Sequence, residues 1–180
     1  MNGPPDIELE CLCTVEEVER AFDRMAGEID AHLAGRDALA LCVLQGGIIP
    51  AGILVPRVEA PLQLDSVHVT RYRNTTRGGD IDWCATPRTP VTGRRVLLVD
   101  DILDEGYSLA AIRDWCLAQG AEEVRVAVLV NKLHERKAPG IRADFVGLDL
   151  PDRYLVGYGM DFQGWFRNAA GILAVPDQHK

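Results

Sequence analysis

The stretch Val96–Leu109, which reads VLLVDDILDEGYSL, decides how the rest of the chain is interpreted. An unbroken run of Val and Leu, bounded by turn-forming residues, is typical of a strand that is buried on both faces of a parallel sheet. Asp100 and Asp101 follow that run, so we expect them at the carboxyl end of the strand, where open α/β sheets bind their ligands. Helical spacing of apolar residues predicts that a helix begins near Leu109 and ends at Gly120.

The loop between this strand and helix, Asp104–Ser108, has the features of a phosphate site. Backbone N–H groups and the positive end of the helix dipole face such a loop, and Ser108 adds a hydroxyl. The loop lacks the Gly-Lys-Ser/Thr of a P-loop and the GxGxxG of a dinucleotide fold. Carboxylates at Asp100 and Asp101 can accept hydrogen bonds from vicinal hydroxyls, or hold a cation through water. A phosphate beside a diol points to a phosphorylated ribose, and the alternative is a merely polar sheet edge.

Composition and charge narrow the class of protein. A chain of 180 residues with 47% hydrophobic and 26% charged residues is typical of one globular domain. A net charge of −8 argues against nucleic-acid binding, which needs a positive surface. The five cysteines are an odd number, and we interpret them as reduced thiols of a cytoplasmic protein. No signal peptide or membrane contact is predicted, because the apolar runs are far shorter than about 18 residues.

Strand and helix patterns alternate along the chain. Thr14 and Glu17 form a capping box, and apolar residues then recur at helical spacing until Gly35. Further strand patterns occupy Ala38–Leu44, Leu62–Tyr72, Ile81–Ala85, Val124–Val130 and Asp144–Leu148. This alternation predicts an α/β fold with a mainly parallel twisted sheet flanked by helices on both faces. The aromatic-rich tail after Pro151 breaks the alternation, and we expect it to pack with the amino-terminal segment as a small hood.

Two loops have binding features of their own. Gln45, Gly46 and Gly47 directly follow the Ala38–Leu44 strand, where a glycine pair lets the backbone approach a ligand closely or simply forms a turn. The segment 71–80, between two strands that form a hairpin, is polar, Gly-rich and locally basic. Loops of this kind are often lids or binding loops, and the alternative is a solvated turn.

The motif VLLVDDILDEGYSL resembles the phosphoribosyl-pyrophosphate signature of the type I phosphoribosyltransferases. In that family the 6-oxopurine enzymes carry Asp at the position of Asp104, so the chain resembles a hypoxanthine-guanine phosphoribosyltransferase. The resemblance covers about residues 36–168. It implies a single domain over residues 1–180, with a core of about 14–148, a hood of about 1–13 plus 149–180, and a flexible hairpin loop.

The resemblance also implies roles for the motif. The family joins C1 of the ribose in phosphoribosyl pyrophosphate to N9 of a purine and releases pyrophosphate, with Mg²⁺. Asp104 is the expected catalytic residue, since it would accept the proton at purine N7. Asp100 and Asp101 would bind the ribose hydroxyls and the metal. The 5′-phosphate would lie against the loop, which gives the expected ribose and phosphate set Asp100, Asp101, Asp104, Glu105, Gly106, Tyr107 and Ser108.

The pyrophosphate site implied by the resemblance departs from the family pattern. Leu44, Gln45, Gly46 and Arg167 would bind pyrophosphate, and Gln45 stands where many members have Lys. That loop commonly carries a non-proline cis peptide, which we expect between Leu44 and Gln45. Arg71 and Tyr72 match the flexible catalytic loop, in which a Ser-Tyr pair is common, and we hypothesise that Arg71 compensates for the missing Lys.

Lys132 resembles the lysine that donates to the purine 6-oxo group. A lysine at that position selects hypoxanthine and guanine over adenine by mispairing. Tyr154 matches the aromatic residue that stacks on the purine, and Leu155 the residue whose backbone meets the base edge. Asp161 resembles a further metal ligand beside Asp100 and Asp101.

The sequence therefore predicts a purine-salvage enzyme that makes IMP or GMP from phosphoribosyl pyrophosphate and a 6-oxopurine base. A xanthine-preferring enzyme is the nearest alternative. A non-catalytic RNA-binding regulator on the same fold is another, although Asp104 and the acidic net charge count against it. A pyrophosphokinase would need a nucleoside-triphosphate site, for which we find no motif. Relatives form dimers and tetramers, so a homodimer or homotetramer is expected by analogy.

Overall fold

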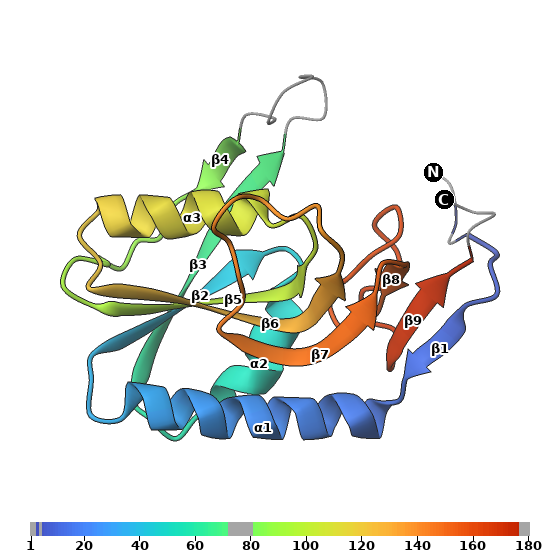
Figure 1. The fold of residues 1–180 in the computed structure, drawn as a ribbon, viewed down its shortest axis with the longest axis horizontal. Helices are drawn as coiled ribbons and strands as arrows, with labels where there is room; N and C mark the ends of the chain where they lie inside the picture. The colour runs from blue at the N-terminus through green and yellow to red at the C-terminus, as the bar shows by residue number, and fades with distance from the viewer. Residues whose placement is uncertain (1–2, 4, 72–80, 177–180) are drawn as a thin grey trace.

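A six-stranded sheet forms the centre of the computed structural model, which describes residues 3, 5–71 and 81–176 (Figure 1). Its strand order is β4-β3-β2-β5-β6-β7, and every neighbouring pair is parallel except the antiparallel edge pair β3–β4. The predicted parallel sheet and the predicted hairpin are both confirmed. The strands are β2 Ala38–Leu44, β3 Leu62–Arg71, β4 Ile81–Ala85, β5 Arg95–Leu103, β6 Glu123–Leu133 and β7 Phe145–Pro151.

Helices cover both faces of this sheet, as the alternating pattern predicted (Figure 1). The helices α1, Val15–Leu33, and α2, Ile48–Leu54, lie on one face, with a 3₁₀ turn at Val55–Arg57 after α2. The helix α3, Tyr107–Ala118, covers the other face. The capping box at the start of α1 is present: the backbone N–H of Glu17 donates to the Thr14 hydroxyl, and the backbone N–H of Thr14 donates to the Glu17 carboxylate.

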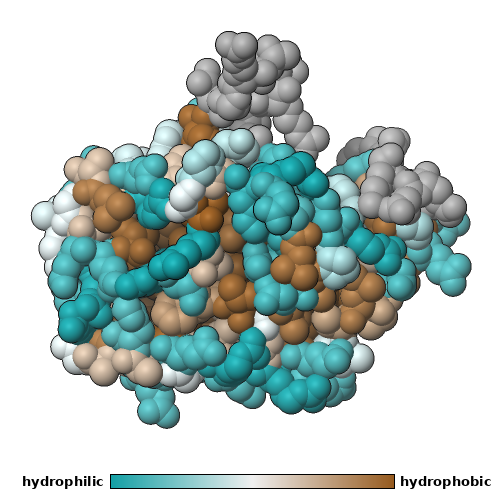
Figure 2. Space-filling model, in the orientation of Figure 1, coloured by the Kyte–Doolittle hydropathy of each residue, from teal (hydrophilic) through white to brown (hydrophobic). Residues whose placement is uncertain are grey.

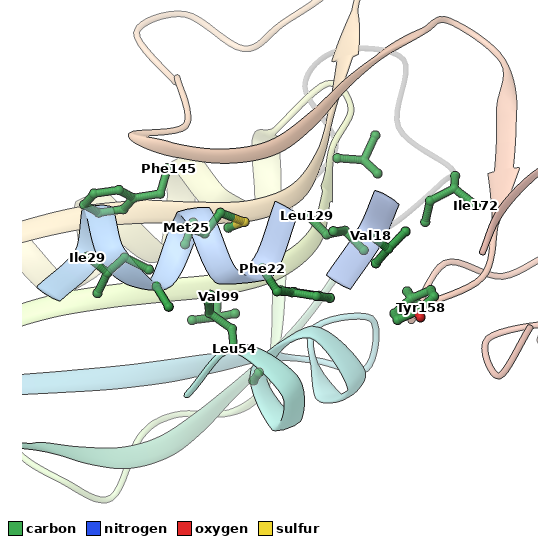
Figure 3. Packing of buried hydrophobic residues seen from close by; sticks show 14 of the residues in the cluster. Val18, Phe22, Met25, Ile29, Leu54, Val99, Leu129, Phe145, Tyr158 and Ile172 are labelled. Carbon is green, nitrogen blue, oxygen red and sulfur yellow. The ribbon is translucent and has the colours of Figure 1, made fainter. Parts of the chain in front are cut away.

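The two hydrophobic cores follow from the period of two in a β-strand. In β5, Leu97 and Val99 point into the core under α1 and α2, whereas Val96 and Leu98 point into the core under α3. All four side chains are at most 2% exposed, which confirms a strand buried on both faces. Figure 3 shows Val99 in one cluster with residues of α1, α2, β6 and β7, which are Phe22, Met25, Ile29, Leu54, Leu129 and Phe145.

A second, three-stranded sheet joins the two ends of the described chain. It consists of β1 Glu10–Cys13, β8 Tyr154–Val156 and β9 Ile172–Val175, in the antiparallel order β1-β9-β8. Its residues Cys13, Leu155 and Ile172 extend the core under α1. The tail therefore packs with the amino-terminal segment, as predicted, beside the main sheet (Figure 1).

Several boundaries differ from the sequence prediction, and in β5 and β6 the cause is backbone pairing that continues past the point where the apolar pattern stops. Strand β5 pairs with β6 as far as Leu103, so Asp100 and Asp101 lie inside the strand rather than after it. Strand β6 likewise continues past Val130 to Leu133 and so includes Lys132. Helix α3 begins at Tyr107 instead of Leu109, because Gly106 adopts a left-handed conformation, with φ of 78°, that turns the chain into the helix.

Hydrophilic and hydrophobic residues are interspersed on the face of the molecule in Figure 2. Among the described residues, the structure has no helix with the length and apolar character that a membrane crossing needs.

Candidate active site

A cavity of about 960 Å³ opens at the carboxyl ends of the parallel strands. It lies where the strand order reverses, since the chain proceeds from β2 outward to β3 on one side and from β5 to β6 on the other. The structure brings many of the predicted site residues to its walls. They are Leu44, Gly46, Asp100, Asp101, Asp104, Ser108, Lys132, Tyr154, Leu155, Asp161 and Arg167.

A smaller pocket of about 210 Å³ adjoins the cavity and shares Asp100, Asp101, Asp104 and Ser108 with it. The loop from Asp104 and the first turn of α3 line this pocket, including Glu105, Gly106 and Tyr107. The positive end of the helix dipole and the backbone N–H groups of the first turn favour anions, and α3 has twelve residues. The loop that the sequence predicts to bind a phosphate group therefore lines a pocket at the start of α3.

Gly46 brings the loop after β2 against the acids of β5. A Cβ atom at this position would lie only 2.2 Å from Oδ2 of Asp101, so no other residue fits without displacing that carboxylate. Gly159 in turn packs against the carbonyl oxygen of Gly46, 2.0 Å from where its own Cβ would be. The predicted cis peptide between Leu44 and Gln45 is present. Gln45 itself is exposed and does not line either pocket.

Asp100 and Asp101 form a buried acidic pair. The backbone N–H of Asp101 donates to Oδ1 of Asp100 at 2.9 Å, and Asp101 is 7% exposed. Burial raises the pKa of Asp100 well above its usual range, and the charge of Asp101 adds to this rise. Burial also raises the pKa of Asp101 to about 6, although Asp100 and Arg167 oppose the rise. The pair therefore holds protons more strongly than exposed carboxylates do.

Asp104 lies among basic groups from the end of β6 and the loop after it. Its Oδ2 is 2.8 Å from Nζ of Lys132, and its Oδ1 is 2.6 Å from Nε2 of His134. Burial tends to raise the pKa of Asp104, but the hydrogen bonds from Lys132 and His134 outweigh it and lower the pKa below the usual value. Asp104 is therefore an ionised hydrogen-bond acceptor at neutral pH.

Lys132 is itself held in place by its neighbours. It is only 8% exposed, and its ammonium group also lies 3.5 Å from Oδ1 of Asp152. Nζ of Lys137 donates to the backbone carbonyl of Lys132 at 2.8 Å and to the carbonyls of Leu103 and Asp104. These bonds tie the end of β6 to the end of β5.

The hood contributes the opposite wall. Nη2 of Arg167 forms an ion pair with Oδ1 of Asp161 at 2.6 Å, and the backbone N–H of Gly164 donates to Oδ2 of Asp161. Tyr154 is 38% exposed and its ring meets that of Phe162 edge to face at 5.4 Å. A half-exposed ring that is supported on one edge can stack on a flat ligand.

Two predicted residues of the flexible loop are not fully described by the structure, and the sequence analysis missed three residues near the cavity. Tyr72 lies outside the described residues, and only the backbone of Arg71 is described, at the end of β3. His134, Asp152 and Lys137 were missed. Their position near the carboxyl ends of β6 and β7 was the only available signal, since a lone residue in a loop has no pattern.

Comparison with known proteins shows the family to which the chain belongs. Residues 13–163 match the family described as the phosphoribosyl transferase domain. The hypoxanthine-guanine phosphoribosyltransferase of Bacillus subtilis is 31% identical over 164 residues, which cover 91% of this chain and 90% of that protein. The human enzyme of the same name is 28% identical over 197 residues, with 97% and 90% covered.

Solved structures agree with the sequence comparison. A crystal structure of a hypoxanthine-guanine phosphoribosyltransferase from Bacillus anthracis superposes with a TM-score of 0.88 at 25% identity, covering 95% of this chain and 100% of that one. A hypoxanthine phosphoribosyltransferase from Staphylococcus aureus has the same fold, with a TM-score of 0.88 at 24% identity, covering 94% and 92%. The chain belongs to the hypoxanthine-guanine phosphoribosyltransferase family of the type I phosphoribosyltransferases.

Proposed function

We propose that the enzyme transfers the 5-phosphoribosyl group from phosphoribosyl pyrophosphate to N9 of hypoxanthine or guanine, giving IMP or GMP and pyrophosphate. The observation that carries this specificity is the pair of Asp104 and Lys132 on one wall of the cavity, an acceptor and a donor 2.8 Å apart. A 6-oxopurine presents an N7–H donor beside an O6 acceptor, which complements that pair. Adenine presents a donor at position 6 and would face the ammonium group of Lys132.

The proposed reaction uses the ionised state of Asp104. The lone pair of N9 attacks C1 of the ribose, the bond from C1 to the pyrophosphate oxygen breaks, and the electron pair leaves with pyrophosphate. The proton on N7 passes to the carboxylate of Asp104. Because the hydrogen bonds to Asp104 lower its pKa, the carboxylate is ionised and ready to accept that proton at neutral pH.

The other predicted residues keep their proposed roles around the same cavity. Glu105, Gly106, Tyr107 and Ser108 would wrap the 5′-phosphate in the smaller pocket, and Asp100 and Asp101 would bind the ribose hydroxyls.

Leu44, Gln45, Gly46 and Arg167 would bind pyrophosphate, and Arg71 and Tyr72 would belong to the loop that covers it. Tyr154 would stack on the base and the backbone of Leu155 would meet its edge. These roles are supported for Leu44, Gly46, Arg167, Tyr154 and Leu155, because all of them line the same cavity. Gln45 is not among its lining residues, and Tyr72 and the side chain of Arg71 lie outside the described part of the chain.

We propose Mg²⁺ as the divalent metal ion. Asp100, Asp101 and Asp161 line the cavity and offer the oxygen donors that this ion takes. The ion would neutralise negative charge on the leaving pyrophosphate. Among the described residues, no basic side chain forms an ion pair with Asp100 or Asp101, so a metal ion can balance the negative charge that appears when their protons leave.

We further propose that core and hood act as a single domain over residues 1–180, since the cavity has walls from both. The proposed location is the cytoplasm, where thiols such as the five free cysteines stay reduced. A homodimer or homotetramer stays a prediction, which sedimentation velocity would test.

The test is a substrate panel with phosphoribosyl pyrophosphate and Mg²⁺, followed by chromatography of the products. We expect turnover of hypoxanthine and guanine and little of adenine or uracil. Preference for xanthine would favour the xanthine enzyme instead. Turnover of none of these bases would contradict the proposed function and favour a regulator on this fold.

A further inference from the structure

His134 lies in the loop after β6, and its ring is packed against Asp104. The side chain is only 5% exposed, and Nε2 is 2.6 Å from Oδ1 of Asp104. The other ring nitrogen, Nδ1, accepts a hydrogen bond from the backbone N–H of Arg136 at 3.0 Å. Both nitrogens of the ring are therefore engaged.

These two bonds fix the chemical form of the ring. An Nδ1 atom that accepts a hydrogen bond from a backbone N–H uses its lone pair for that bond and therefore carries no proton. The proton of the neutral imidazole is then on Nε2, which donates it to Asp104. His134 is thus a neutral, oriented donor, and its orientation is set by the backbone of its own loop.

The two oxygens of Asp104 are held differently. Oδ1 is bonded to the buried ring of His134, whose place is fixed by the loop. Oδ2 is bonded to the ammonium group of Lys132, which in the proposed function bonds the 6-oxo oxygen of the base. Oδ2 can therefore be released while Oδ1 stays fixed.

We propose that His134 is a positioning residue, which holds Asp104 through Oδ1 so that Oδ2 faces the N7 proton of the base. This inference rests on the proposed function, in which Asp104 accepts that proton. A carboxylate without the bond to His134 could rotate about its side chain toward Lys132, and its acceptor oxygen would leave the productive geometry. Misplacement of a reacting group by about 1 Å can cost 10²-fold in rate.

A metal ion is the alternative occupant of this cluster. Ligand atoms of Asp104, His134 and Asp152 lie within 4.8 Å of one another. However, Lys132 already lies between the two carboxylates, and Nη2 of Arg136 is 2.8 Å from Oδ2 of Asp152. The charge of the cluster is therefore balanced by its own basic side chains, and we assign the ring of His134 to Asp104.

The charged groups around Asp104 determine how its titration responds. Lys132 and His134 bond its carboxylate, Lys137 bonds its backbone carbonyl, and Arg136 lies nearby. Loss of the bond from His134 removes one of the interactions that lower the pKa of Asp104. The acid limb of the pH profile of kcat/KM should then shift to higher pH, because a larger share of Asp104 is protonated at a given pH.

The test compares His134→Leu, which has no donor, with His134→Gln, whose amide can donate to Asp104. For His134→Leu we expect kcat to fall about 10–100-fold, with KM for phosphoribosyl pyrophosphate within about twofold of wild type. His134→Gln should recover most of the loss, and its acid limb should stay near that of wild type. Glu135→Gln, an exposed change in the same loop, should behave as wild type.

A second measurement does not depend on turnover. The ring nitrogens of His134 should show the Nε2–H tautomer by ¹⁵N NMR, and the carboxyl pKa of Asp104, followed by ¹³C NMR, should rise in His134→Leu but not in His134→Gln. Absence of turnover in the wild-type protein would contradict the proposed function, and the NMR result would still decide the role of His134. An Nδ1–H tautomer, an unmoved Asp104 pKa, or equal kcat for His134→Leu and wild type would overturn the inference.

Discussion

Gly46→Ala should damage catalysis more than folding. A Cβ at this position would lie 2.2 Å from Oδ2 of Asp101, which falls about 1.2 Å short of the 3.4 Å of an ordinary contact. The obstacle is the end of a side chain, so the fold can respond by moving the carboxylate of Asp101. The added methyl group therefore changes the acidic pair rather than the backbone.

The size of that movement sets the expected effect. A displacement of about 1 Å in a positioned group can cost 10²-fold in rate, so we expect kcat/KM for phosphoribosyl pyrophosphate to fall about 10²-fold. The free energy of unfolding should fall by about 1–3 kcal/mol, which is typical when a methyl group is added to a packed site.

The neighbouring glycine gives the opposite expectation. A Cβ at Gly47 would lie 2.5 Å from the carbonyl oxygen of Val99 and 2.6 Å from that of Val43, and both belong to strands that cannot easily move. Gly47→Ala should therefore lose more stability than Gly46→Ala.

Gly52→Ala in α2 is the matched control, because nothing lies within 4 Å of its Cβ position. It should keep full activity and gain up to about 1 kcal/mol from helix propensity. Steady-state kinetics and urea unfolding of the three variants measure both effects. A Gly46→Ala variant with kcat/KM within twofold of wild type would refute the reasoning.

Three further substitutions test the site. Asp104→Asn should lower kcat by about 10²–10⁴-fold, because the amide cannot accept the proton, while calorimetry should show nucleotide affinity largely kept, because the side chain keeps its size. Near-normal turnover would remove the role of Asp104 as proton acceptor. Lys132→Ala should weaken the use of hypoxanthine and guanine more than the binding of phosphoribosyl pyrophosphate, and an unchanged base preference in competition assays would show that another residue reads position 6. Because burial raises the pKa of Asp101 to about 6, the folded protein holds more protons than the unfolded chain between about pH 4 and 6, and stability falls as pH rises through that window. Urea unfolding of Asp101→Asn in the presence of a chelator should show a smaller fall in stability over this pH range. An unchanged dependence of stability on pH would contradict a raised pKa for Asp101.

The fold was predictable because each element has a local pattern with one dominant physical cause. Burial on both faces makes Ala38–Leu44 continuously apolar, and the strand has those bounds in the structure. Thr14 and Glu17 start α1 because they satisfy each other's backbone donors. The ends of β5 and β6 were wrong because strand pairing depends on the partner backbone, and polar side chains such as Asp100 and Lys132 do not stop it.

The site was predictable where a residue belongs to a recognisable motif. The loop Asp104–Ser108 has a recognisable motif, and its residues do line one pocket. The contact of His134 with Asp104 joins positions 30 residues apart and depends on how one irregular loop folds. The glycine after β2 was expected to admit a ligand, and in the structure Gly46 lines the cavity while its missing side chain also leaves room for the carboxylate of Asp101.

The charge of the site explains why an acidic protein can bind a highly anionic substrate. Asp104 is paired with Lys132, Asp152 with Arg136 and Asp161 with Arg167. Each of these carboxylates holds its cation at the cavity or beside it. Because the charges of each pair cancel, little net charge is exposed before a substrate binds. Asp100 and Asp101 are different, because among the described residues no cation forms an ion pair with either of them. Burial raises their pKa values and so favours their protonated forms. If a metal ion balances that pair, its affinity must rise with pH as protons leave Asp101, and calorimetric titration of Mg²⁺ at pH 5 and pH 7.5 should show tighter binding at the higher pH.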